Sequence, residues 1–149
     1  MLKDKLTIYS SPEDEKRVRE LILGCVPDIE LNMVRLTAVA PDANETDIVV
    51  TSDCRCVVIP YDFSLDTADS VRKLTYSDNG AKGDISGLNL QKRETCTCFE
   101  LLYGVFMSRV YIPLSSVYTA PQVLMCICIL CGWGASVEKV IPVVNEFLK

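Results

Sequence analysis

Two short and almost wholly apolar runs, DIVVTS at residues 47–52 and CVVIP at residues 56–60, constrain the fold more than any other feature of the sequence. A strand that is apolar on both faces must be covered on both sides, which is typical of parallel strands in an α/β sheet. The runs at residues 5–10 and 33–38 favour two further strands. The sequence therefore predicts an α/β fold with a parallel sheet portion and helices packed on the sheet.

Further along the chain, the pattern indicates more strands and a hairpin. Residues 70–76 and 85–90 are typical of strands, and Asp78-Asn79-Gly80 between them is a turn signal. Apolar and polar residues alternate from Thr95 to Ile112, with Gly104 in the middle. This alternation predicts an antiparallel hairpin region beside the parallel portion.

Three segments have helical spacing. The first is predicted over residues 13–25, because Ser10-Ser11-Pro12-Glu13 combines a serine cap with proline and acids in the first turn. The second is predicted over residues 118–131 and stops at Gly132-Trp133-Gly134. The third opens at Ser136-Val137-Glu138-Lys139. These helices give the expected fold its covering layers.

Composition limits the classes of function. A chain of 149 residues without internal repeats is expected to form one domain. The net charge is −5 and the basic residues are scattered, so nucleic acid is not an expected partner. The longest apolar candidate, residues 123–135, is too short to cross a membrane, and the N-terminus turns acidic where a signal peptide is apolar. We therefore expect a cytoplasmic protein, and the 49% hydrophobic content favours a homodimer or another protein partner.

Eight cysteines and no histidine raise the question of a metal site, above all in MCICILC at residues 125–131. Zinc sites use C-x₂₋₄-C pairs, whereas Cys54/Cys56 and Cys96/Cys98 are spaced C-x-C, which in a strand places both on one face, as core residues are. In the predicted helix, Cys126 lies roughly 200° from Cys128. Packing is the favoured interpretation, with a metal or cluster site and redox sensing as alternatives. If any thiol is reactive, we expect Cys54 and Cys56, which flank Arg55.

Other polar features favour structural roles. Asp62, Asp66 and Asp69 are interpreted as an acidic, solvated loop rather than catalytic acids, because they have no histidine or metal partner. The turn at Asp78 lacks the ligand spacing of a calcium loop. Trp133 is interpreted as a packing residue in preference to a binding anchor.

The second half of the chain resembles a known family. KLTYS, GDISGLNL, CFELL and IPLSSVYTAPQVLMCICILCGWGASVEKVIPVVNEFL follow one another over residues 73–148. Their order and spacing resemble the latter part of the central, ATP-binding domain of the Mur ligases, which add amino acids to the muramyl precursor of peptidoglycan and are related to folylpolyglutamate synthetases. The resemblance implies a three-layer α/β fold. It also implies that residues 1–149 are one compressed central domain, without the N-terminal UDP-binding and C-terminal ligase domains.

The resemblance further implies that the family's chemistry has been lost. LTIYSSPEDEKR stands where the family has a phosphate-binding loop of the kind ITGTNGKTT, but it supplies Pro12, which has no N–H, and the carboxylates Glu13 and Asp14. The pattern G-x-x-G-K-[ST] occurs nowhere in the chain. ATP binding is therefore not expected.

A second family motif, written lpG.HNvyNalAA, has also changed. Alignment with IPLSSVYTAPQ places Ser115 and Ser116 at the His-Asn pair and Thr119 at the later Asn. The family's metal-binding histidine and glutamate have no counterpart, and the segment expected to carry them is compressed to residues 47–62. The residues that match the family are expected to be structural: Leu90, Phe99, Leu101, Ile112, Val117, Tyr118, Gly134 and Phe147.

The sequence therefore predicts a degenerate Mur-ligase-like domain, a non-catalytic binding or assembly module related in ancestry to peptidoglycan enzymes. We assign no catalytic residue, no cofactor-binding residue and no metal ligand. One alternative is a divergent enzyme, or enzyme subunit, that still binds a peptidoglycan or folate-type precursor. The other is a cysteine-based metal protein.

Overall fold

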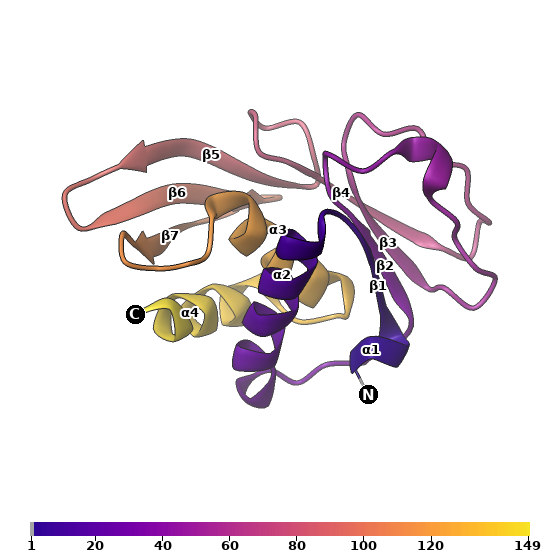
Figure 1. The fold of residues 1–149 in the computed structure, drawn as a ribbon, viewed down its shortest axis with the longest axis horizontal. Coiled ribbons are helices and arrows are strands. Elements are labelled where there is room, and N and C mark those ends of the chain that lie inside the picture. Colours follow the sequence, from indigo (N-terminus) through magenta and orange to yellow (C-terminus); the bar gives the residue numbers. More distant parts are fainter. Residues whose placement is uncertain (1) are drawn as a thin grey trace.

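Seven strands form one sheet, and their order in space follows their order in the chain (Figure 1). The computed structural model describes residues 2–149. Strands β1 to β5 pair in parallel, and β5, β6 and β7 pair antiparallel. The elements are α1 (Leu2–Lys5), β1 (Leu6–Tyr9), α2 (Pro12–Cys25), β2 (Leu36–Val39), β3 (Cys56–Pro60), β4 (Arg72–Ser77), β5 (Ile85–Lys92), β6 (Cys96–Tyr103), β7 (Phe106–Pro113), α3 (Ala120–Gly132) and α4 (Val137–Leu148), with short 3-10 turns at Val26–Asp28 and Glu45–Asp47. The predicted α/β class, with a parallel portion and an antiparallel hairpin region, is confirmed.

The two faces of the sheet are covered by different kinds of structure. Helices α2, α3 and α4 gather on one face, and the loops at residues 40–55 and 61–71 lie on the other (Figure 1). Side chains from β3 alternate between the two layers, with Val58 facing the helices and Val57 facing the loops. Every residue of β3 is consequently buried. This explains why CVVIP is apolar throughout, as the sequence predicted.

The prediction of a strand at residues 47–52 is wrong. The segment passes through a 3-10 turn at Glu45–Asp47 and then runs unpaired across the loop-covered face of the sheet. Ile48 packs on the sheet, whereas the side chain of Val49 is 65% exposed. The hydroxyl of Tyr9 donates to the carbonyl of Val49 and accepts from its N–H, both at 3.2 Å. The run is apolar because it covers the sheet, not because it joins it.

The helix termini follow from local chemistry. The hydroxyl of Ser11 accepts from the N–H of Asp14 and caps α2, as its sequence predicts. Gly134, at φ 98°, ends α3 in a Schellman motif, and the following N–H, that of Ala135, donates to Leu130 at 3.1 Å. Gly132, predicted to stop the helix, is its last residue. A Cβ at this position would lie 2.8 Å from Leu36, so glycine allows α3 to approach the sheet closely.

Three of the residues expected to be structural lie at the surface. Leu90 is 62% exposed, Val117 is 58% exposed, and Phe147 is partly exposed where its ring covers Gly24 of α2. The other five pack against the core, contribute to it or end a helix: Phe99, Leu101, Ile112, Tyr118 and Gly134. Among the described residues, no helix has the length and apolar character needed to cross a membrane.

Candidate functional site

A crevice opens where the carboxyl ends of β1, β2 and β4 meet the N-termini of α2 and α3. Open α/β sheets bind their ligands at this edge. The crevice has three depressions. The first is shallow, with a cavity volume of about 30 Å³, and is lined by Asp14, Tyr76 and Gln122 among others; the second, of about 70 Å³, is lined by Phe99 and Leu90 among others. The third, of about 440 Å³, lies over the residues that follow β1 and β2.

Tyr76 fills the floor of the first depression. It lies near the end of β4, and its hydroxyl donates to the carbonyl of Val39 at the end of β2, at 2.5 Å. The side chain therefore crosses β3 on the helix-covered side of the sheet. Burial, with smaller contributions from nearby Cys128 and Asp78, raises the pKa of this phenol above its ordinary value. Tyr76 is thus a neutral donor that ties two strand ends together.

The N-terminus of α2 already holds the negative charge that such a helix end attracts. Its first turn contains Glu13, Asp14 and Glu15. The carboxylate of Asp14 accepts a hydrogen bond from the side-chain amide of Gln122 at 2.8 Å, which joins α2 to α3 across the crevice. Arg17 pairs with Glu13 at 3.0 Å and also with the nearby Glu20, so its charge is already matched.

The N-terminus of α3 is built by the residues aligned with the family's polar motif. Thr119 caps the helix in a capping box, in which its N–H donates to the side-chain oxygen of Gln122 at 3.0 Å. The hydroxyl of Ser116 accepts from the N–H of Tyr118 at 3.1 Å, while Ser115 is exposed. Thr119 and Ser116 thus shape this turn and cap the helix that follows.

Acidic side chains surround the crevice without basic counterparts. Asp14 and Asp78 line the first depression, and Asp42 and Asp47 line the third. Among the described residues that line the three depressions, none is lysine or arginine. Uncompensated carboxylates at the edge of a sheet make this crevice electrostatically suited to cations.

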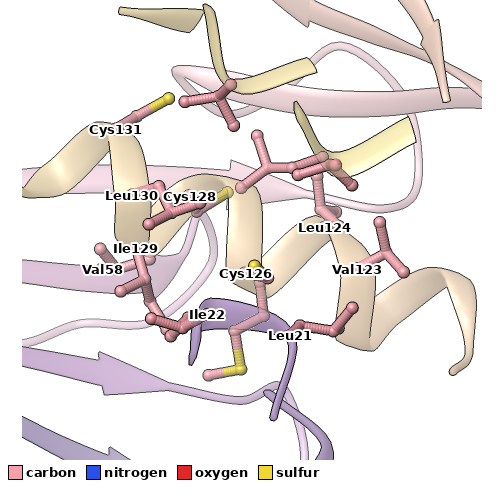
Figure 2. Close-up of a cluster of buried hydrophobic side chains, with 14 of the residues drawn as sticks. Leu21, Ile22, Val58, Val123, Leu124, Cys126, Cys128, Ile129, Leu130 and Cys131 are labelled. Atoms are coloured by element: carbon pink, nitrogen blue, oxygen red, sulfur yellow. The ribbon is translucent and has the colours of Figure 1, made fainter. Parts of the chain in front are cut away.

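The cysteines do not form a metal centre. Within residues 2–149, no three His, Cys, Asp or Glu side chains are placed to hold a metal ion together. Figure 2 shows that Cys126, Cys128 and Cys131 lie at separate points along α3, among leucine, isoleucine and valine side chains. Seven of the eight cysteines are buried, and Cys96 is half-buried. The packing interpretation of MCICILC agrees with these positions.

Cys54 and Cys56, which the sequence favoured as the reactive thiols if any thiol is reactive, are poorly placed to react. Both side chains are buried. The thiol of Cys54 donates to the carbonyl of Cys56 at 3.2 Å and contacts the hydroxyl of Thr37 at 3.5 Å. Burial raises the pKa of Cys56 to about 11. A thiol that is shielded and protonated at neutral pH is a poor nucleophile.

The remaining predicted features behave as structural elements. Asp62, Asp66 and Asp69 are exposed on the loop over residues 61–71. Trp133 is only 1% exposed, and its indole N–H donates to the carbonyl of Val34 at 2.8 Å, which confirms its packing role. Asp78 begins a turn in which the N–H of Asn79 donates to Ser77, as the sequence predicted.

Sequence reasoning missed several residues that define the crevice. Asp42 follows β2 and Asp78 follows β4, so their positions at strand ends were the available signal. No such signal marked Tyr76 and Gln122, because the hydrogen-bond partner of each side chain is far away in the sequence.

Comparison with known proteins places the fold. No family model and no curated protein matches the chain. A crystal structure of MurF from Acinetobacter baumannii aligns with 95% of this chain and 44% of its own, at a TM-score of 0.59 and 10% identity. The structure of a UDP-N-acetylmuramoyl-L-alanyl-D-glutamate–2,6-diaminopimelate ligase aligns with 95% of this chain and with 28% of the ligase chain. The TM-score is 0.54 and the sequence identity is 13%. The chain thus has a Mur-ligase-like fold and spans less than half the length of either ligase.

Proposed function

We propose that this chain is a non-catalytic, Mur-ligase-derived domain that acts as a binding or assembly module and holds no nucleotide. The hydrogen bond between Asp14 and Gln122 is the main support. It places a carboxylate of the chain itself, fixed by α3, in the first turn of α2, where the resemblance expects a phosphate-binding loop. The crevice keeps its location in the fold but has the opposite charge preference.

The physical argument concerns the N–H groups at the start of α2. A helix N-terminus binds phosphate when several N–H groups are free and the surroundings are positive. Here the hydroxyl of Ser11 accepts the N–H of Asp14, and Pro12 contributes none. A triphosphate at this position would face Glu13, Asp14 and Glu15. The repulsion between these carboxylates and the phosphate groups disfavours binding, and the loop over residues 10–14 contains no lysine to offset it.

A calorimetric titration with Mg-ATP tests the proposal. We expect no measurable heat at millimolar nucleotide and no change in the thermal midpoint of the chain. A ligand present at about 100 times its Kd would stabilise the folded state by about 2.7 kcal/mol, which a thermal scan detects easily. Saturable binding of ATP at cellular concentration would overturn the proposal.

The partner of the module is part of the same proposal. Either another protein or a second copy of the chain would bind, because the surface exposes large apolar residues such as Leu90, Val105 and Met107. Light scattering at micromolar concentration tests self-association: a dimeric mass supports it, and a monomeric mass counts against it.

A further inference from the structure

We propose that the first two depressions form one groove, the α3 groove, which binds a peptide segment of a partner protein carrying a lysine or arginine next to a large apolar residue. The two depressions share Asp78, Pro121 and Leu124, so they are continuous. This inference rests on the proposed function of the chain as a binding module and names the chemistry of its partner.

The apolar half of the groove is an open side-chain pocket. Phe99 and Leu124 form its walls, and Leu90 lies at its rim with 62% of its surface exposed. Gly87 forms the back of the pocket, and a Cβ added there would meet Phe99 at 3.4 Å and Leu124 at 3.5 Å. The missing side chain of Gly87 therefore leaves space for an apolar group from a partner.

The charged half of the groove selects a cation. Asp14 and Asp78 line the first depression. Gln122 holds one oxygen of Asp14, and because a carboxylate accepts several hydrogen bonds, Asp14 retains the capacity to accept from a cation. The walls beside these acids are apolar, including Val18 and Met125. A lysine or arginine satisfies both conditions, since its stem is apolar and its head is charged.

The same observations disfavour other occupants. A bare metal ion would find no three ligands in convergent positions among residues 2–149. An anion would face Asp14 and Asp78 without any basic side chain in the lining. A purely apolar segment would leave both carboxylates unmatched. Charge complementarity combined with an apolar pocket therefore points to a basic-apolar peptide.

NMR titration of the isotope-labelled chain with three synthetic peptides tests the proposal. The probe is N-acetyl-Leu-Lys-Leu-amide, and the controls replace its lysine with norleucine, which keeps the stem without the charge, or with glutamate. We expect the lysine peptide to shift the amide signals of Gly87, Gln122 and Leu124, to bind about tenfold more tightly than the norleucine peptide, and to weaken as salt is added. Equal affinity for all three peptides, or shifts located elsewhere, would overturn the proposal.

Two variants and a matched control sharpen the test. Asp78→Asn should weaken the lysine peptide about fivefold and leave the norleucine peptide unchanged. Gly87→Ala, whose added methyl group meets only ordinary contacts, should weaken both peptides by partly filling the pocket. Asp69→Asn makes the same change in net charge on the loop over residues 61–71 and should have no effect. Equal losses for Asp78→Asn and Asp69→Asn would contradict a local charge site.

The two proposals fail in different ways. If neither the peptides nor ATP bind, the inference about the α3 groove is wrong while the absence of nucleotide binding stands. If ATP binds and shifts the signals at the start of α2, the proposed function is wrong whatever the peptides do.

Discussion

The two ends of helix α3 differ in almost every physical respect. The C-terminal half, from Cys126 to Cys131, is buried among apolar side chains. At the other end, Pro121 and Gln122 line a crevice with uncompensated carboxylates. The unusual residues of the sequence are therefore the inert ones, and ordinary residues form the open site. A chemically reactive residue type indicates function only where solvent or a ligand reaches it.

The contrast has a simple packing origin. The cysteine half of α3 lies against β2 and β3, where Gly132 permits close approach, so only small or apolar side chains fit. The N-terminal end lies at the edge of the sheet, where Pro121 is exposed and Gln122 lines the crevice. Polar side chains such as Gln122 are tolerated there because they find partners, in this case Asp14.

The largest effect should come from breaking the packed end. Trp133→Ala removes a side chain that is almost fully buried and leaves the carbonyl of Val34 without its indole donor. We expect a loss of about 3–5 kcal/mol in the free energy of unfolding, measured by urea denaturation. Leu90→Ala, at the exposed rim of the α3 groove, is the control and should cost far less. Similar losses in the two variants would contradict the distinction between the ends.

Alkaline pH should destabilise the packed region through its thiols. Burial raises the pKa of Cys56 to about 11 and that of Cys131 to about 12, from an ordinary value of 9.0. Below pH 9 both thiols are protonated in the folded and in the unfolded chain, so their ionisation does not change the free energy of unfolding. Above pH 9, the unfolded chain releases protons that the folded chain retains, so each thiol lowers stability by about 1.4 kcal/mol per pH unit until its folded pKa is reached.

The measurement is the slope of unfolding free energy against pH between 9 and 11, compared for the native chain and Cys56→Ala. The variant loses one of the titrating thiols, so its slope should be shallower. An unchanged slope would show that Cys56 is solvated in the folded chain. It would contradict the conclusion that the side chain of Cys56 is buried.

At the crevice end, Gln122→Glu should destabilise the contact between α2 and α3. The substitution replaces the donor to Asp14 with a second carboxylate and keeps the size of the side chain. We expect a loss of about 1–3 kcal/mol at neutral pH. Two adjacent carboxylates hold a proton more tightly than one, so the deficit should shrink as the pH falls and grow as it rises. Gln122→Met, which removes the donor to Asp14 and the acceptor for the N–H of Thr119 without adding charge, is the control, and its deficit should change less with pH than that of Gln122→Glu.

Much of the fold could be predicted because periodicity reports burial. The burial of β3 on both faces and the hairpin of β6 and β7 followed directly from their patterns. Residues 47–52 misled because a segment that covers a sheet is apolar for the same reason as a strand within it. Leu90 and Val117 were expected to be structural because they match the family, but both are exposed. A match in residue type does not determine whether the side chain is buried.

The candidate site was less predictable because its contacts are tertiary. Asp14 and Gln122 are 108 positions apart, and each has an adequate local interpretation, an acid in a first helical turn and a capping-box partner. The sequence indicated that the loop at Ser11 could not hold phosphate. Only the structure shows that its acid is paired across the crevice and that Asp78 lies on the same groove.

The smallest effect on stability should come from Asp78→Asn, and this variant separates the two ends of α3 most sharply. Asp78 is exposed, so its loss should change the unfolding free energy by less than about 0.5 kcal/mol, measured by urea denaturation beside the native chain. The buried half of α3, residues 126–131, should be unaffected, since Asp78 lies on an exposed turn after β4. If instead the Asp78→Asn variant unfolds at a markedly lower urea concentration than the native chain, Asp78 contributes to the stability of the fold. The crevice would then be a closed structural element, and the contrast between the two ends of α3 would no longer hold.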